Sequence, residues 1–226
     1  RYIVYAKNSF PLNISLEGMR IVLDCANGAA YKVAPAIFSE LGADLVVIGA
    51  EPNGYNVNDK CGALHPDNLA AAVVKYRADV GISLDGDADR VIMVDDKGEI
   101  VNGDHILAIC AIHLSKKKSL KQNTIVATQM SNVGLDHAMK KHGIYVVRTD
   151  VGDKNVVEAV VVADGGQRRG VGGERDRGPA RALLLVAADD LGGDVLCVRC
   201  AAAIADQQQL VACLQGIRDG ARDGVR

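Results

Sequence analysis

Short runs of aliphatic and β-branched residues alternate along residues 19–149 with stretches in which apolar side chains recur at helical spacing. In residues 31–41, for example, Val33, Ile37 and Leu41 fall on one face of a helix. The predicted strands cover residues 19–24, 43–48, 79–84, 90–95, 124–128 and 144–149, and the predicted helices residues 31–41, 68–77, 104–114 and 133–142. Strands that alternate with helices are typical of βαβ units. We therefore predict an α/β fold with doubly wound, mostly parallel sheets.

Two polar residues stand where predicted helices begin. Asp104 precedes the apolar run of residues 106–112, and Ser131 lies just before the helix of residues 133–142. Side-chain oxygens of Asp and Ser accept hydrogen bonds from the free N–H groups of a first helical turn. We expect these two residues to be the caps.

The composition narrows the classes of protein to which the chain can belong. Its 226 residues are 49% hydrophobic and 24% charged, which is typical of a globular protein. The longest apolar runs have seven residues, far below the roughly 18 that a membrane-spanning helix needs. The net charge of −2 gives no basic excess for binding nucleic acid. Six cysteines without a secretory leader predict free thiols and a cytoplasmic protein.

A change of composition after Lys154 suggests how the chain is divided. Residues 155–226 contain nine Arg but no Lys, Ser, Thr, His, Met, Phe or Tyr. A shifted reading frame or a junction would account for this loss. We predict the end of a preceding domain or linker at 1–16, an α/β domain at 17–118, the first part of a second α/β domain at 119–165 and a divergent tail at 166–226. The polar, lysine-rich stretch 116–123 is either the boundary or a solvated turn.

Three carboxylates follow the buried strand of residues 80–84 at alternate positions, in the loop Asp85-Gly86-Asp87-Ala88-Asp89-Arg90. At about 5 Å and an effective dielectric constant near 20, each pair of carboxylates repels by roughly 3 kcal/mol. A cation would relieve this repulsion, and hard oxygen ligands favour Mg²⁺. A solvated acidic turn is the alternative.

The acidic loop matches two further motifs less well. An EF-hand would require Gly at the position of Arg90 and Glu at the position of Asp96. A haloacid-dehalogenase-type phosphatase would use Asp85 as the nucleophile, but Asp89 stands where that motif has Thr or Val. The phosphatase stays open as an alternative.

Five segments resemble the α-D-phosphohexomutases in their motifs and in their order. They are residues 24–35 (DCANGAAYKVAP), 51–66 (EPNGYNVNDKCGALHP), 84–104 (LDGDADRVIMVDDKGEIVNGD), 128–135 (TQMSNVGL) and 148–158 (RTDVGDKNVVE). The resemblance covers about residues 1–165 and is strongest to the bacterial branch that isomerises glucosamine phosphates. It implies phosphohexomutase domain 2 and part of domain 3. It also implies that glucosamine 6-phosphate and glucosamine 1-phosphate are interconverted through a phosphoserine and a 1,6-bisphosphate.

The resemblance assigns roles to particular residues. It implies that Mg²⁺ is bound by the phosphoserine together with Asp85, Asp87 and Asp89. Arg90 would contact phosphate or form a salt bridge that holds the loop. The remaining residues expected to bind the phosphorylated hexosamine are Asp153 and Lys154 in a loop that faces the sugar phosphate, and Glu174 at the start of the sugar-binding loop.

Several departures from the family pattern limit what this chain can do. The phosphoserine loop, of the type T-A-S-H-N-P, is not in the sequence, so we expect no catalytic nucleophile and no activity from this chain alone. Asp150 stands where many members have Lys, and the sugar-binding loop diverges after Glu174. A fragment that only binds Mg²⁺ or a sugar phosphate is therefore a further alternative.

Overall fold

The computed structural model describes residues 1–8, 10, 15–163 and 196–197. These residues fall into two compact units, one ending at Asn102 and the other beginning at Gly103. No helix in the described ranges combines the length and the apolar character required to cross a membrane. The predicted tail and Glu174 lie outside the described residues, except for the short strand β8 (Leu196–Cys197).

The first unit is built around a mixed sheet. Its elements are α1 (Tyr2–Asn8), β1 (Arg20–Asp24), α2 (Val33–Glu40), β2 (Asp44–Ile48), α3 (Asp67–Tyr76), β3 (Val80–Leu84), β4 (Arg90–Asp95) and β5 (Ile100–Val101). The strands lie in the order β2-β1-β3-β4-β5, with β1 parallel to both neighbours and β4 antiparallel to β3 and β5. The predicted doubly wound α/β fold is confirmed, and β4 and β5 give it an antiparallel edge.

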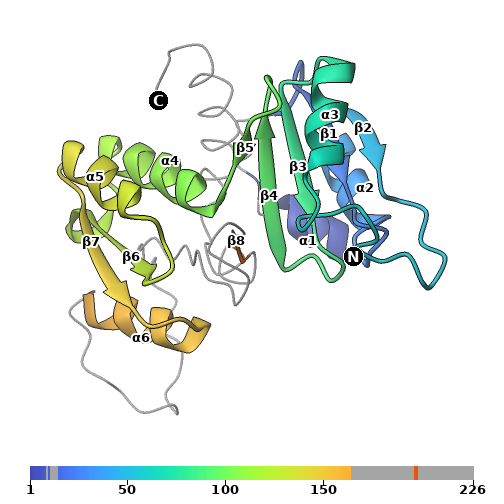
Figure 1. The fold of residues 1–226 in the computed structure, drawn as a ribbon. Coiled ribbons are helices and arrows are strands. Elements are labelled where there is room, and N and C mark those ends of the chain that lie inside the picture. Colours follow the sequence, from blue (N-terminus) through green and yellow to red (C-terminus); the bar gives the residue numbers. More distant parts are fainter. Residues whose placement is uncertain (9, 11–14, 164–195, 198–226) are drawn as a thin grey trace. The chain divides into compact units, whose positions relative to one another are not determined.

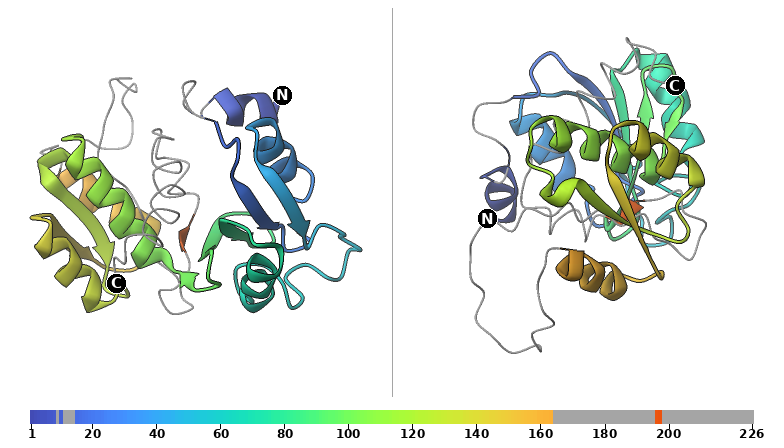
Figure 2. Two further views of the ribbon diagram at one scale, coloured as in Figure 1. Left: turned by 90° about the horizontal axis from the view of Figure 1, so that it is seen from above. Right: turned by 90° about the vertical axis from the view of Figure 1, so that its left-hand side faces the viewer.

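Helices cover both faces of this sheet. The chain passes from β1 to β2 on one side and then returns past β1 to β3 on the other. Because such crossovers are right-handed, this reversal puts the two connecting helices on opposite faces. Figures 1 and 2 show α2 and α3 in these positions. The central strands β1 and β3 are consequently buried over almost their whole length.

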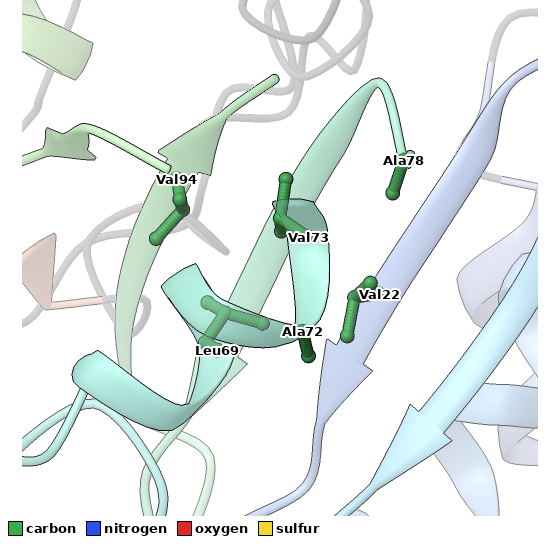
Figure 3. Packing of buried hydrophobic residues seen from close by; sticks show 6 residues of the cluster. All are labelled: Val22, Leu69, Ala72, Val73, Ala78 and Val94. Atoms are coloured by element: carbon green, nitrogen blue, oxygen red, sulfur yellow. The ribbon is translucent and has the colours of Figure 1, made fainter. Parts of the chain in front are cut away.

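The face under α3 contains a close-packed aliphatic cluster. Its members are Val22, Leu69, Ala72, Val73, Ala78 and Val94 (Figure 3). The helix approaches the sheet closely because β3 has a glycine beneath it. A Cβ atom at Gly81 would lie 2.6 Å from Val73 Cγ2 and 2.9 Å from Leu69 Cγ. Gly81 therefore sets the distance between α3 and the sheet.

The second unit contains another βαβ crossover. Its described elements are α4 (Gly103–Lys116), the 3₁₀ turn η1 (Lys121–Asn123), β6 (Thr124–Thr128), α5 (Val133–Lys141), β7 (Tyr145–Thr149), α6 (Asp153–Ala163) and β8. Strands β6 and β7 are parallel, with Val126 opposite Val147. Helix α4 packs on α5, α5 on β7, and α6 on both strands.

Both predicted helix caps are wrong. Helix α5 is capped by Asn132, whose side chain accepts a hydrogen bond of 2.8 Å from Gly134 N, so the cap lies one residue after Ser131. Asp104 lies inside α4, and its carboxylate instead accepts a hydrogen bond of 2.7 Å from the backbone N of Asn132. Asp104 therefore joins α4 to the start of α5 through a residue that lies 28 positions away in the sequence.

The lysine-rich stretch forms a turn within the second unit. Backbone hydrogen bonds from Lys117 N to His113 O and from Lys118 N to Ser115 O close the end of α4. Helix α4 packs on α5 and belongs to the second compact unit, which begins at Gly103. The predicted domain boundary at residue 118 stays a prediction.

Two thiols at the carboxyl ends of the first strands have raised pKa values. Cys25 is fully buried, and burial together with the nearby Asp24 carboxylate raises its pKa to about 12. Cys61 is partly exposed; burial and then the carboxylates of Asp24 and Asp59 raise its pKa, while a hydrogen bond from Asn27 lowers it. Both cysteines are free of disulfide bonds.

We expect Gly81→Ala to lower the free energy of unfolding by about 1–3 kcal/mol, the usual cost of overpacking a core. Val73→Ala removes the methyl group that the new Cβ would meet. The double variant should therefore lose less stability than the sum of the two single variants. Urea unfolding followed by circular dichroism measures all three, and strictly additive losses would contradict this role of Gly81.

We expect iodoacetamide to modify Cys61 in the folded protein and to leave Cys25 unmodified at about pH 8.5, the usual pKa of a thiol. Only the thiolate reacts, and burial both excludes the reagent from Cys25 and keeps its sulfur protonated. Peptide mass spectrometry separates the two sites. In urea the two cysteines should react alike, and equal reaction in the folded protein would show that Cys25 is accessible.

Candidate functional site

The carboxyl ends of β1, β2 and β3 lie at one edge of the first sheet, because the three strands are parallel (Figure 1). The strand order reverses between β1 and β3. In open α/β sheets, ligands bind at the strand ends beside such a reversal. The acidic loop follows β3 and so lies at this point.

The structure brings the three acidic side chains of this loop together. One carboxylate oxygen from each of Asp85, Asp87 and Asp89 lies within 4.8 Å of the others. In an octahedral Mg²⁺ site with bonds of about 2.1 Å, ligand oxygens are about 3 to 4.2 Å apart. The three oxygens therefore need to close only slightly to share one cation, and carboxylates are suitable donors for it. The residues present fit a divalent metal ion.

Asp85 is the anchor of the loop. Its side chain is only 1% exposed, and its Oδ1 accepts hydrogen bonds of 3.0 Å from the backbone N atoms of Asp89 and Arg90. Burial raises the pKa of Asp85, but the backbone N–H and side chain of Arg90 and a hydrogen bond with Asp87 bring it below its usual value. Asp85 is therefore ionised near neutral pH.

Arg90 holds this loop from its last position. Its Nε lies 2.9 Å from Asp85 Oδ2 and 3.8 Å from Asp89 Oδ1. These contacts are those of a salt bridge, which is one of the two roles expected for Arg90. Binding of substrate by Arg90 stays a prediction.

The same contacts do not favour Asp85 as the nucleophile of a phosphatase. A carboxylate nucleophile must present an oxygen to the phosphorus atom of its substrate. Asp85 Oδ1 accepts two backbone N–H groups, Oδ2 accepts the guanidinium of Arg90, and the residue is almost completely buried. Its geometry suits a fixed ligand better than an attacking group.

Sequence reasoning missed Asp24, which ties the neighbouring loops together. This buried carboxylate accepts hydrogen bonds from Ala26 N at 2.9 Å, Gly62 N at 2.7 Å and Ser83 Oγ at 3.4 Å. It thereby joins the loops after β1 and β2 to the end of β3. An Asp at the end of an otherwise apolar strand was the available signal.

In the second unit, Arg148, near the end of β7, holds the loop that follows β6. Its Nη1 donates hydrogen bonds to Thr128 O at 2.6 Å and Ser131 O at 2.9 Å, and its Nη2 pairs with Asp136. Gln129, which follows Thr128, adds two more hydrogen bonds between the ends of β6 and β7. Its backbone N lies 3.0 Å from Thr149 O, and its side chain donates to Asp150 Oδ1 at 2.9 Å. Asp150 is thus held by the side-chain amide of Gln129.

The predicted sugar-phosphate residues follow this connection. Asp153 and Lys154 are the first two residues of α6, and Lys154 is exposed. Gly152 precedes them with a φ of +123°, a conformation that favours glycine. A helix N-terminus with an adjacent lysine suits a phosphate group.

Comparison with known proteins identifies two consecutive domains. Residues 1–98 match the family model for phosphoglucomutase/phosphomannomutase, alpha/beta/alpha domain II, and residues 102–180 match that for domain III. The two matches meet where the structure divides the chain, at Asn102.

Relatives at high sequence identity share one name. The phosphoglucosamine mutase of Bdellovibrio bacteriovorus is 67% identical over 158 residues, which are 70% of this chain and 35% of the relative. That of Geobacter sp. strain M21 is 58% identical over 161 residues, which are 71% of this chain and 36% of the relative. The chain therefore spans about a third of the length of these curated relatives.

Solved structures share the fold at low sequence identity. A phosphoglucomutase/phosphomannomutase family protein from Burkholderia thailandensis superposes with a TM-score of 0.66 at 20% identity, over 97% of this chain and 45% of the other. A putative phosphomannomutase from Thermus thermophilus gives a TM-score of 0.65 at 18% identity, over 99% and 47%. These likenesses show the fold, and the two domain matches, which together cover most of the chain, show that it belongs to the phosphoglucomutase/phosphomannomutase family, of which it carries domain II and sequence of domain III.

Proposed function

We propose that this chain supplies the metal-binding loop and part of the substrate site of a phosphoglucosamine mutase. That enzyme would interconvert glucosamine 6-phosphate and glucosamine 1-phosphate. The observation that carries the proposal is the convergence of Asp85, Asp87 and Asp89 in a chain that is 67% identical to a protein of that name. The nucleophile would be a phosphoserine outside these 226 residues, because the sequence contains no loop of the T-A-S-H-N-P type.

In this proposal, Asp85, Asp87 and Asp89 hold Mg²⁺. The bound ion would supply positive charge to the oxygens of the phosphoryl group that is transferred. Asp85 keeps its carboxylate in place through the backbone of Asp89 and the guanidinium of Arg90. This fixed arrangement means that the loop would need only a slight closing of its oxygens to receive a cation.

The start of α6 would bind a phosphate group of the sugar substrate. Lys154 offers an exposed ammonium group, and the first N–H groups of the helix have no partner within the helix. Arg148 and Gln129 hold the preceding strand end in place. Asp153 and Glu174 are proposed as further contacts with the sugar phosphate on the strength of the family resemblance alone.

We expect calorimetric titration of the chain with MgCl₂ to show one weak site. Asp87→Asn should weaken binding by about tenfold, because it removes one of the three charges that attract the ion. Asp96→Asn is the matched control. It removes the same charge from an exposed turn at the far end of β4, and its affinity should equal that of the unmodified chain. Equal affinity in the Asp87 variant would refute the assignment.

The proposed activity can be tested in a chimera. The matching segment of the Bdellovibrio bacteriovorus relative is replaced by this chain's residues, and turnover of glucosamine phosphates is measured. We expect the chimera to be active and Lys154→Gln to raise KM by about tenfold, since a charged hydrogen bond contributes about 1.5–3 kcal/mol. Lys141→Gln, at the exposed end of α5, should leave KM unchanged. The chain alone should be inactive. An inactive chimera that folds would contradict the proposal.

A further inference from the structure

Gly86, inside the acidic loop, is confined from two sides. Its φ is not in the left-handed region, so its backbone conformation does not require glycine. Glycine is required because the neighbouring residues leave no room for a side chain. A Cβ atom at this position would lie 2.5 Å from Val57 Cγ1 and 3.0 Å from Asn58 Nδ2. The loop after β2 therefore lies directly against the acidic loop.

The loop after β1 confines Gly86 from a second direction. A Cβ atom at Gly28 would lie only 2.3 Å from Gly86 O and 2.7 Å from Gly86 Cα. Ala29 N donates a hydrogen bond of 2.8 Å to Gly86 O. On this side the backbone of the loop after β1 lies directly against the backbone of the acidic loop, and no side chain lies between them. The side that can be altered by mutation without a clash is the one formed by Val57 and Asn58.

Asn58 is itself firmly held. Its backbone N donates a hydrogen bond of 2.9 Å to Ala26 O, and its φ is +59°. Its Oδ1 lies 3.1 Å from the place that a Cβ atom at Gly62 would occupy. The carboxamide therefore fits between two glycines, with Gly62 near its oxygen and Gly86 near its nitrogen.

The stability of the fold does not account for this carboxamide. Oδ1 of Asn58 is buried and has no hydrogen-bond partner among the residues that the structure describes. A buried polar atom without a partner costs about 1–3 kcal/mol. Glycine would satisfy the left-handed backbone without that cost. We therefore look for the role of this amide group in its contact with the acidic loop.

We propose that Asn58, supported by Val57, is a positioning residue that keeps the carboxylates of Asp85, Asp87 and Asp89 close enough to share one cation. The inference rests on the metal site of the proposed function. Mutual repulsion drives the three charges apart, and Mg²⁺ tolerates little departure from octahedral geometry. Contact at Gly86 opposes the spreading of the loop, although neither Asn58 nor Val57 needs to touch the ion.

The test measures the affinity of the full chain for Mn²⁺, from the electron paramagnetic resonance signal of the free ion. Asn58→Gly removes the carboxamide and keeps the left-handed backbone. We expect its Kd to rise by about tenfold, the lower end of what residues behind metal ligands contribute. Asn58→Asp preserves the shape of the side chain and should bind at least as tightly as the unmodified chain. Tyr55→Ser, in the same loop at a residue that is 96% exposed, is the matched control and should change nothing.

Thermal unfolding of each variant separates positioning from stability. A folded Asn58→Gly variant with unchanged Kd and a lower melting temperature would overturn the inference and leave the metal site standing. If the unmodified chain binds no Mn²⁺, both the inference and the proposed site fail. If Asn58→Gly does not fold, Val57→Ala decides, because Val57 is 46% exposed and contacts the same glycine. An unchanged Kd in that variant would also overturn the inference.

Discussion

The buried carboxylate of Asp24 is the interaction on which the geometry of the strand ends depends. A charge removed from water is stable only when it is fully hydrogen-bonded. Asp24 meets this requirement with donors from Ala26, Gly62 and Ser83, which belong to three separate segments. Gly49 is part of the same arrangement, since a Cβ atom there would lie 2.3 Å from Asp24 Oδ1. The need to satisfy one carboxylate thus fixes how the loops after β1 and β2 meet β3.

The sequence predicted those features that depend on neighbours along the chain. The alternation of apolar residues placed β1 to β4 and β6 to β7 within a residue or two of their observed bounds. The spacing of Asp85, Asp87 and Asp89 predicted that their oxygens could gather around one point, as they do. Both patterns are local, because strand periodicity and a six-residue loop involve only residues that are consecutive in the sequence.

The features that sequence reasoning missed depend on tertiary contacts. Asp104 is a residue type that often caps helices, but its carboxylate accepts a hydrogen bond from Asn132, at the start of another helix. Asn58 and Gly86 are 28 positions apart, and only the parallel arrangement of β1, β2 and β3 brings them together. Arg148 in β7 likewise finds its acceptors at the end of β6 and in the loop that follows it. The periodicity of a single sequence does not indicate which distant residues will form such contacts.

The acidic loop also joins two antiparallel strands of the central sheet. Leu84 pairs with Val91 directly on either side of it, and Asp85 N donates a hydrogen bond of 3.3 Å to Arg90 O. These two contacts belong to the ladder of the sheet, so the sheet holds both ends of the loop while Asp87 at its middle is exposed. The ends of the acidic loop are therefore fixed to β3 and β4. A conformational change that leaves the sheet of the first unit intact would therefore leave both ends of this loop in place.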